Sequence, residues 1–256
     1  MTFNGFVNVI IPAAGRGSRF SNEGWKKPKP FIDVNKKSML EHVIKNISPY
    51  ESKVHLLLNS EHINAFPDIV SVLSEKSDNI IEVSGVTEGT ACTVLLAKEH
   101  FNNDIPMMVG NSDQLVDFDI NEFIFDCFNR NLDGSILVFK DIEKNPKWSF
   151  TRCNLDGLVV EVAEKKPISD LATVGIYLFS KGSKFVEAAE EMIAKNDKVN
   201  NEFYTCPVYN YMIKKGARIG VFEVPMEAMH GIGTPKDLTS YLELIESQPS
   251  IDRPDI

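Results

Sequence analysis

The chain has 256 residues, and its 27 lysines and arginines against 36 aspartates and glutamates give a formal net charge of −9. A chain of this length forms one large domain or two small ones, and it buries enough surface to fold without disulfides or metals. With 43% hydrophobic and 25% charged residues, collagen-like, disordered and disulfide-scaffold classes are excluded. The acidic balance argues against nonspecific nucleic-acid binding.

The cysteines and the N-terminal residues bear on the cellular compartment. Four cysteines are dispersed without metal-ligand spacing, at Cys92, Cys127, Cys153 and Cys206. This spacing favours reduced thiols over a zinc site or a disulfide framework. The first residues show no basic segment followed by an apolar core, and no apolar run approaches about 18 residues. We therefore expect a cytoplasmic protein without a signal peptide or membrane segment.

Strands alternate with helices in the first half of the chain. Short apolar runs rich in β-branched residues predict strands at residues 7–12, 54–58, 80–83, 106–109 and 135–139. Helical spacing of apolar residues predicts helices at 39–47, 90–97 and 119–129. Thr90 is the expected N-cap of the second helix. This alternation predicts a mostly parallel sheet covered by helices on both faces.

The pattern changes after about residue 141. Residues 148–154 and 158–163 are predicted to form a hairpin that turns at Asp156-Gly157. Further strands are expected at 173–179 and 218–224, and helices at 183–194, 205–215 and 236–246, with Gly216 ending the second of these helices. We predict a single domain over residues 1–246, divided into halves at 1–140 and 141–246, with a flexible tail at 247–256.

The strongest functional signal directly follows the first strand. Its small residues allow backbone N–H groups to approach an anion, and they are Ala13, Ala14, Gly15 and Gly17. Positive charge is added by Arg16 and Arg19, and then by Lys26, Lys27 and Lys29. Because α/β sheets bind ligands at the carboxyl ends of their strands, this loop predicts a polyphosphate site. The alternative is a solvated basic loop with a glycine turn.

Two familiar phosphate-binding motifs fit this loop poorly. In the dinucleotide motif Gly-x-Gly-x-x-Gly, the third glycine would stand where this chain has Phe20, and the following segment with Pro28 and Pro30 cannot begin a helix. Asp33 follows a proline-rich loop rather than a second strand, so it is a poor ribose-binding acid. The Gly-x-x-x-x-Gly-Lys-Ser/Thr loop is absent from the sequence.

An ordered set of motifs resembles the nucleotidylyltransferases that activate sugar 1-phosphates, with capsule and surface-polysaccharide enzymes as the most similar branch. The motifs cover nearly the whole chain in the family's order, at residues 13–19, 29–30, 39–41, 88–91, 110–113, 164–167, 174–177 and 233–235. The resemblance implies an α/β fold of Rossmann-like (GT-A-like) type. Its sheet would be mixed, mostly parallel and flanked by helices, with a small β-rich substrate-binding insertion. Residues 1–140 would then bind nucleotide and residues 141–246 the acceptor.

Asp113 and the turn at residues 88–90 are the next candidates. Asp113 follows a predicted strand, and a lone carboxylate there suits Mg²⁺, although a turn cap would also explain it. The resemblance implies that Asp113 binds the metal and that Glu88, Gly89 and Thr90 contact the nucleotide base. An ionised Glu88 only accepts hydrogen bonds, which favours the amine of cytosine over a uracil carbonyl, although guanine also offers donors. Guanylyl and thymidylyl enzymes usually have a second glycine within the Ala13-Ala14-Gly15 stretch. We therefore expect CTP or another pyrimidine triphosphate.

The acceptor site is expected in the second half of the chain. Glu164, Lys165 and Lys166 read as a solvated charged turn by themselves, and the resemblance implies that they hold the phosphorylated acceptor. The extra lysine leaves open whether Lys165 or Lys166 contacts the acceptor's phosphate. Gly175 belongs to the strand that would line the sugar pocket. Trp148 and Phe150 are expected as core or dimer contacts.

One departure from the family's pattern concerns the metal. Gly231 stands where relatives carry a second metal-binding aspartate, so water, Glu227 or a phosphate oxygen would complete the coordination, or the acceptor is unusual. The neighbouring His230 is expected to be packed or at the surface rather than in contact with substrate.

The residues together predict a reaction between two anionic substrates. A phosphate oxygen of the acceptor would attack the α-phosphorus of a nucleoside triphosphate and release pyrophosphate, with Arg19, Lys29 and Asp113 as catalytic residues. One alternative is a GT-A-type glycosyltransferase that uses a nucleotide sugar. Such an enzyme would be expected to have paired aspartates around its metal. Another is a non-catalytic nucleotide-binding regulator, which Gly231 would permit. A homodimer is an open expectation.

Overall fold

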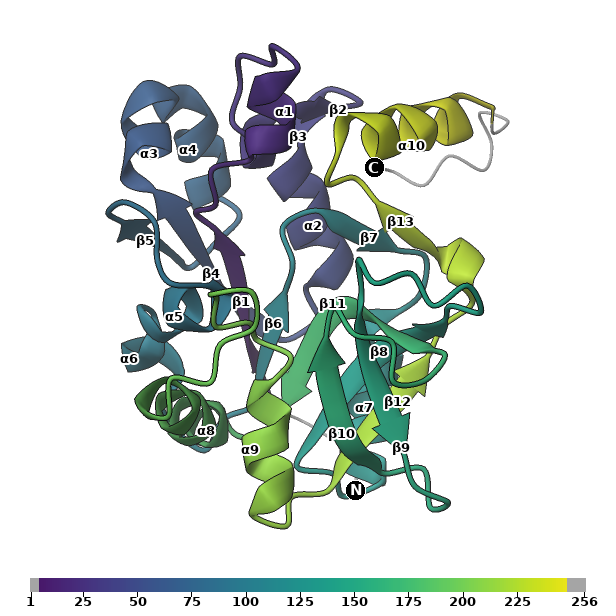
Figure 1. The fold of residues 1–256 in the computed structure, drawn as a ribbon. Coiled ribbons are helices and arrows are strands. Elements are labelled where there is room, and N and C mark those ends of the chain that lie inside the picture. Colours follow the sequence, from purple (N-terminus) through teal and green to yellow (C-terminus); the bar gives the residue numbers. More distant parts are fainter. Residues whose placement is uncertain (1–4, 248–256) are drawn as a thin grey trace.

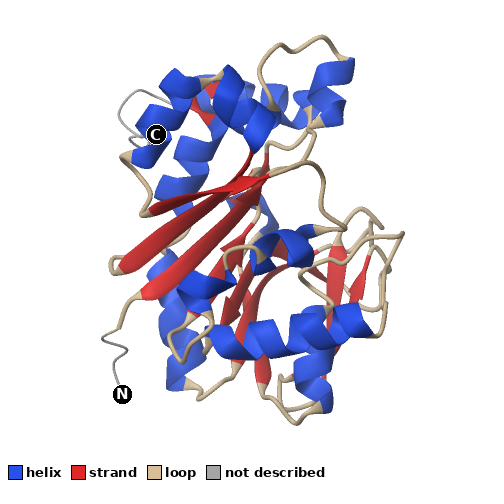
Figure 2. Ribbon diagram, turned by 90° about the vertical axis from the view of Figure 1, so that its left-hand side faces the viewer, coloured by secondary structure: helices blue, strands red, loops and turns tan. Residues whose placement is uncertain are grey.

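The computed structural model describes residues 5–247, and a nine-stranded mixed sheet runs through the molecule with helices on both of its faces (Figures 1 and 2). The strands of one half of the sheet pair in parallel, and they are β6 (Met107–Gly110), β1 (Val7–Ala13), β4 (Ser52–Asn59) and β5 (Asn79–Val83). The other half joins through β11 (Leu171–Phe179), which is antiparallel to β6. Its further strands are β8 (Gly134–Lys140), β12 (Ile219–Glu223), β9 (Ser149–Cys153) and β10 (Val159–Glu164).

The helices lie on the two faces and at the ends of this sheet (Figure 1). They are α1 (Ser18–Asn22), α2 (Met39–Ile47), α3 (Ser60–Ala65), α4 (Pro67–Ser74), α5 (Thr90–Leu95), α6 (Lys98–Phe101), α7 (Ile120–Asn129), α8 (Gly182–Ala194), α9 (Val208–Lys214) and α10 (Pro235–Ser247). Two short 3₁₀ helices are present, η1 (Lys29–Phe31) and η2 (Met226–Ala228). Two small ribbons complete the fold, β2 (Asp33–Val34) with β3 (Lys37–Ser38), and β7 (Gln114–Val116) with β13 (Met229–Gly231). Within residues 5–247, no helix has both the length and the apolar content needed to cross a bilayer.

The local chemistry of the sequence explains the central elements. Strand β1 is buried along almost its whole length because helices cover both of its faces, and its side chains contribute to separate apolar clusters on the two sides. Helix α2 begins with a capping box in which the Ser38 hydroxyl accepts from the Glu41 backbone and the Glu41 carboxylate accepts from the Ser38 backbone. Gly216, at φ +85°, ends α9 as the sequence predicts, because this left-handed conformation is open to glycine.

The mixed α/β sheet and the strands predicted from the sequence are confirmed, and several details are corrected. Helices α3 and α4 were not expected, although Asn59 caps the first of them and Pro67 opens the second. The short helix α1 begins directly after Gly17, where none was predicted. Helix α10 extends to Ser247, so this residue does not belong to a tail, and residues 248–256 lie outside the described chain.

Thr90 does not have the predicted capping role. Gly89 is the N-cap residue of α5, and Thr90 is the first residue inside the helix. The expected helix at 90–97 also ends earlier, at Leu95, and a separate helix α6 follows.

His55 makes the stability of this fold sensitive to acid. The His55 ring is buried between Asn8, whose Oδ1 lies 3.3 Å from Nε2, and Asn79, whose Nδ2 lies 3.1 Å from Nδ1, and it stacks on His100. Burial, with a smaller contribution from His100, lowers the pKa of His55 from 6.5 to about 4. Between pH 6.5 and about pH 4, His55 is protonated in the unfolded chain but stays neutral in the folded protein. The free energy of unfolding therefore falls as the pH falls through this range.

We expect His55 alone to contribute a loss of about 3 kcal/mol in the free energy of unfolding between pH 7 and pH 4. Urea unfolding at several pH values measures this, with His55→Gln as the comparison. The variant should be less stable at pH 7 and should show a flatter decline towards pH 4. An equally steep decline in both proteins would contradict the assignment.

Candidate active site

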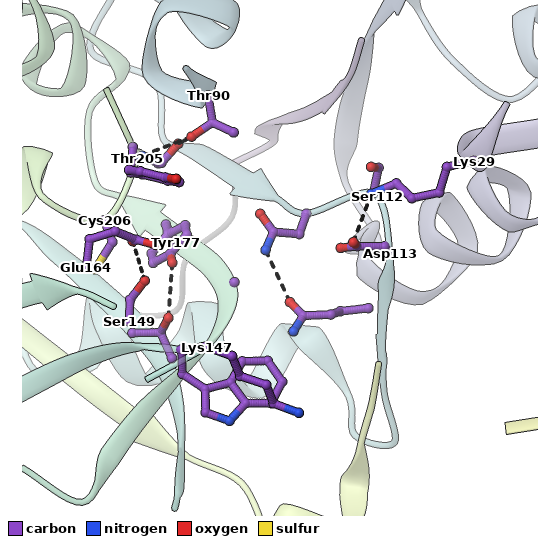
Figure 3. Close-up of a pocket in the computed structure, with 16 residues that line it drawn as sticks. Lys29, Thr90, Ser112, Asp113, Lys147, Ser149, Glu164, Tyr177, Thr205 and Cys206 are labelled. Carbon is purple, nitrogen blue, oxygen red and sulfur yellow. Dashed lines mark hydrogen bonds and ion pairs between the residues drawn. The ribbon is translucent and has the colours of Figure 1, made fainter. Parts of the chain in front are cut away.

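A cavity of about 310 Å³ opens beside the carboxyl end of β6 and the start of α5, and the residues that follow β6 line it (Figure 3). Segments far apart in the chain meet there because β11 pairs with β6 and brings the second half of the chain alongside the first. The lining residues are Lys29, Thr90, Asn111, Ser112, Asp113, Gln114, Lys147, Trp148, Ser149, Glu164, Thr173, Gly175, Tyr177, Tyr204, Thr205 and Cys206.

Lys29 and Asp113 form an ion pair at one end of this cavity. The Lys29 Nζ lies 2.8 Å from the Asp113 Oδ2, and the two side chains are 20% and 25% exposed. Lys29 reaches this position from the 3₁₀ turn η1, which Pro28 precedes and Pro30 stiffens. Gly17, at φ +60°, permits the close approach, because a Cβ at this position would lie 2.8 Å from the Cβ of Lys29.

The backbone around Asp113 is held by two glycines. Gly175 has φ +95°, and a Cβ there would lie 2.2 Å from the side-chain Nδ2 of Asn111. A Cβ at Gly233 would lie 2.4 Å from the Asp113 Oδ2, and the neighbouring Ile232 N–H donates to the Asp113 carbonyl. The carboxylate is therefore confined between the end of β6 and the segment that follows β13.

The donor set around Asp113 fits a Mg²⁺ ion that draws its other ligands from the substrates. Gly231 pairs with Gln114 across β7 and β13, which places it beside Asp113, but it offers no side-chain ligand. Glu227 is exposed on η2 and does not line the cavity. In the described part of the chain, no group of three or more acidic, histidine or cysteine side chains could hold a metal by itself. A single carboxylate with phosphate oxygens and water is a common Mg²⁺ environment.

His230 is a packed residue, as the sequence predicted. Its Nε2 lies 2.7 Å from the Asp117 Oδ2, and its ring contacts Tyr241. It does not line the cavity beside Asp113.

Only one of the five cations in the basic segment at residues 16–29 lines the cavity. Lys29 lines it, whereas Arg16 and Arg19 are exposed and lie outside its lining, and Lys26 is exposed as well. Lys27 is engaged with Asp33 at 2.6 Å. Ala13 and Ala14 are buried at the end of β1, and Gly15 is exposed with no atom within 4 Å of an added Cβ. Open space thus lies above Gly15, beside the exposed arginines.

Gly15→Ala is expected to weaken triphosphate binding at least tenfold and to leave the melting temperature unchanged. The new Cβ meets no protein atom within 4 Å, and it would occupy space through which an anion approaches the backbone. Calorimetric titration with nucleoside triphosphates and thermal unfolding measure the two effects. Unchanged affinity in Gly15→Ala would place the triphosphate elsewhere.

The predicted base-binding turn is tied to a segment more than a hundred residues away. Gly89, at φ +132°, approaches Phe203 so closely that a Cβ would lie 2.4 Å from the Phe203 carbonyl oxygen. The Phe203 N–H donates to the Glu88 carbonyl, and the Glu88 carboxylate lies 3.3 Å from the Lys198 Nζ. Thr90 accepts from the backbone and hydroxyl of Thr205 (Figure 3). Of the predicted base-contacting residues, Thr90 lines the cavity and Glu88 does not.

The predicted acceptor residues separate into two groups. Glu164 and Gly175 line the cavity, and the Ser149 hydroxyl donates to the Glu164 carboxylate at 2.5 Å. Burial raises the pKa of Glu164. Lys165 and Lys166 are both exposed and lie outside the cavity lining. Lys165 donates to the hydroxyl of Tyr204, which lines the cavity, whereas the Lys166 side chain has no partner among residues 5–247.

The structure adds cavity residues that the sequence did not reveal. Trp148 packs on the core, as expected, with its ring centroid 5.4 Å from that of Phe139. It also lines the cavity, where the Lys147 Nζ lies 4.3 Å from the centroid of its ring. Phe150 is fully buried, as expected. Tyr204 and Thr205 follow no recognisable motif, and only the packing of their segment against the turn at Gly89 identifies them.

This architecture, a mixed sheet with ligand-binding residues at the carboxyl ends of its parallel strands, is a Rossmann-like nucleotide-binding fold. The model of the nucleotidyl transferase family matches residues 8–248. The chain belongs to this family, as the motifs predicted.

Several relatives are similar to the chain. It is 24% identical over 177 residues to the bifunctional protein GlmU of Methanocaldococcus jannaschii, covering 68% of this chain and 40% of that protein. It is 23% identical over 182 residues to the mannose-1-phosphate guanylyltransferase catalytic subunit beta of Dictyostelium discoideum, covering 68% and 50%. The chain therefore spans half or less of the length of these curated relatives.

Solved structures match over more of the chain. A nucleoside-diphosphate-sugar pyrophosphorylase from Vibrio cholerae is 26% identical with a TM-score of 0.79, covering 92% of this chain and 99% of that one. A UDP-glucose pyrophosphorylase crystallised with UDP-glucose shares the fold, with 16% identity, a TM-score of 0.75 and coverage of 95% and 100%.

Proposed function

We propose that the protein joins a nucleoside triphosphate to a phosphorylated sugar or sugar-like acceptor and releases pyrophosphate. The observation that carries this proposal is the Lys29–Asp113 ion pair. It lies at one end of the cavity, which Glu164 and Gly175 also line, and Gly17 of the glycine loop closely approaches Lys29. The names of similar proteins, a mannose-1-phosphate guanylyltransferase and a nucleoside-diphosphate-sugar pyrophosphorylase, describe the same type of reaction, which supports the proposal.

The residues around the pair suit a transfer without a protein nucleophile. A phosphate oxygen of the acceptor would attack the α-phosphorus in line, and no general base is needed because the acceptor is already anionic at neutral pH. Lys29 would stabilise charge on the α-phosphoryl group. Arg16 and Arg19 would turn from solvent to the β- and γ-phosphates. Glu164, Gly175 and one of the two lysines after Glu164 would hold the acceptor.

Asp113 would hold Mg²⁺ together with phosphate oxygens. When bound, such an ion neutralises phosphate charge and aligns the phosphate oxygens. Water or a substrate oxygen would take the place that Gly231 leaves without a ligand.

CTP, or another pyrimidine triphosphate, is the proposed nucleotide. Glu88 lies at the turn before α5, where its carboxylate is paired with Lys198. It would turn from Lys198 towards the base, and an exocyclic amine would be its natural partner because a carboxylate only accepts hydrogen bonds. We further propose that the enzyme works in the cytoplasm, in capsule or surface-polysaccharide biosynthesis, and that it needs neither nucleic acid nor membrane as a partner. The motif set, which resembles that of capsule and surface-polysaccharide enzymes, supports the proposed role in that biosynthesis.

A pyrophosphate-release assay tests the function. Each nucleoside triphosphate is combined with Mg²⁺ and a panel of phosphorylated acceptors that includes glucose 1-phosphate and mannose 1-phosphate. Release that requires both CTP and an acceptor is the expected result. Transfer from a nucleotide sugar would instead favour the glycosyltransferase, and tight triphosphate binding without release would favour the regulator.

A further inference from the structure

Tyr204 lies where the wall of the acceptor pocket meets the predicted base-binding turn. Its neighbours on both sides are bound to this turn. The Phe203 carbonyl accepts from the Ala91 N–H at 2.9 Å, and the Thr205 N–H and hydroxyl donate to the Thr90 hydroxyl at 3.1 and 3.2 Å. The position of the Tyr204 backbone is therefore set by the nucleotide half of the molecule, while its side chain lines the cavity.

The Tyr204 side chain binds Lys165. The Lys165 Nζ donates to the Tyr204 hydroxyl at 2.6 Å and lies 4.6 Å from the centroid of the ring. Lys165 has φ +53°, a left-handed conformation that is unusual for a residue other than glycine, immediately after β10. Because the backbone turns at Lys165, the side chains of Lys165 and Lys166 can point in different directions.

The contact between Lys165 and Tyr204 holds the ammonium without neutralising it. Lys29 and Lys198 are paired with carboxylates, whereas Lys165 has no carboxylate within 4 Å in the described chain. An ammonium has three donors, and the hydroxyl takes one of them, so two remain for an anion. Lys166 is exposed, as Lys165 is, but it has no partner that fixes its side chain within residues 5–247. A cation that is fixed beside the cavity and forms no ion pair is a favourable phosphate contact.

We propose that Tyr204 is a positioning residue that holds Lys165, rather than Lys166, as the lysine that receives the phosphate of the acceptor. This inference rests on the proposed function for the identity of the acceptor's reacting group. Because residues 203–205 are also bound to the turn at Thr90, Tyr204 fixes the acceptor's lysine relative to the wall that the nucleotide would occupy.

Chemical protection by inorganic phosphate tests the inference without nucleotide or turnover. The intact protein is treated with acetic anhydride at increasing phosphate concentrations, and the acetylation of each lysine is measured by peptide mass spectrometry. Phosphate should protect Lys165 and leave Lys166 reactive. In Tyr204→Phe the phosphate concentration that gives half protection should rise about tenfold, because the ring remains but the hydroxyl that fixes the ammonium is lost.

Lys166→Gln is the matched control, and it should leave the protection of Lys165 unchanged. The melting temperature of Tyr204→Phe shows whether the variant is folded. Protection of Lys166 or Lys147 in place of Lys165, no protection at Lys165, or an equal half-protection concentration in Tyr204→Phe would each overturn the inference. Because the assay contains no nucleotide, these results are separate from a failure of pyrophosphate release, which would overturn the proposed function instead.

Discussion

Replacing Lys29 by alanine is expected to lower the turnover number by about 10²–10³ and to change nucleotide affinity little. Lys29 lies at the end of the cavity with its ammonium 2.8 Å from Asp113, so it is placed to act on charge that develops at the α-phosphorus. The ground-state triphosphate would retain its other contacts with the glycine loop and the arginines. The loss should therefore appear in kcat, because only interactions that are stronger in the transition state accelerate the chemical step.

Pyrophosphate release under saturating substrates measures the turnover number of Lys29→Ala, and calorimetric titration measures nucleotide affinity. Lys27→Ala is a matched control from the same loop, since its ammonium is engaged with Asp33 rather than the cavity. It should retain nearly the full rate. An unchanged turnover number in Lys29→Ala would remove this lysine from the mechanism.

The second large effect is expected for Asp113→Asn. The amide has the size of the carboxylate, so the confined position between β6 and Gly233 is preserved while the negative charge is lost. We expect turnover to fall about 100-fold or more, and the Mg²⁺ concentration for half-maximal rate to rise at least tenfold. The free energy of unfolding should change by less than about 1 kcal/mol, because the ion pair with Lys29 is partly exposed to solvent.

Rates over a Mg²⁺ titration and a thermal unfolding curve check both parts of this prediction. Asp117→Asn is the control, since Asp117 follows the other end of β7, where its carboxylate contacts His230. An equal Mg²⁺ requirement in Asp113→Asn and the wild type would show that Asp113 does not hold the metal.

Much of the candidate site follows from the sequence because its parts are local. Small residues directly after a buried strand identify Gly15 and Gly17, and a carboxylate directly after another strand identifies Asp113. Since parallel strands end at one edge of a sheet, their meeting there can be predicted without coordinates. Lys29 was predicted from the same loop, and the ion pair with Asp113 agrees with its expected place.

Other residues depend on contacts that no local pattern encodes. Arg16 and Arg19 were expected to bind the triphosphate, yet both are exposed and neither lines the cavity. The backbone turns into α1 directly after Gly17. Trp148 packs on the core as expected, but no local pattern shows that it also lines the cavity. Tyr204 carries no motif, and its place depends on the fit of Phe203 against Gly89.

The sequence by itself determined the α/β class, the main strands, the glycine loop and the nucleotidyl transferase family, because each follows from patterns within short segments. The tertiary structure alone decided which cation meets Asp113, which side chains line the cavity, and that Lys165 is held by Tyr204 while Lys166 has no partner within residues 5–247. The physical reason is that these contacts join segments separated by tens of residues or more. Their geometry is set by the pairing of β11 with β6 and by the packing of residues 203–205 on the turn at Gly89.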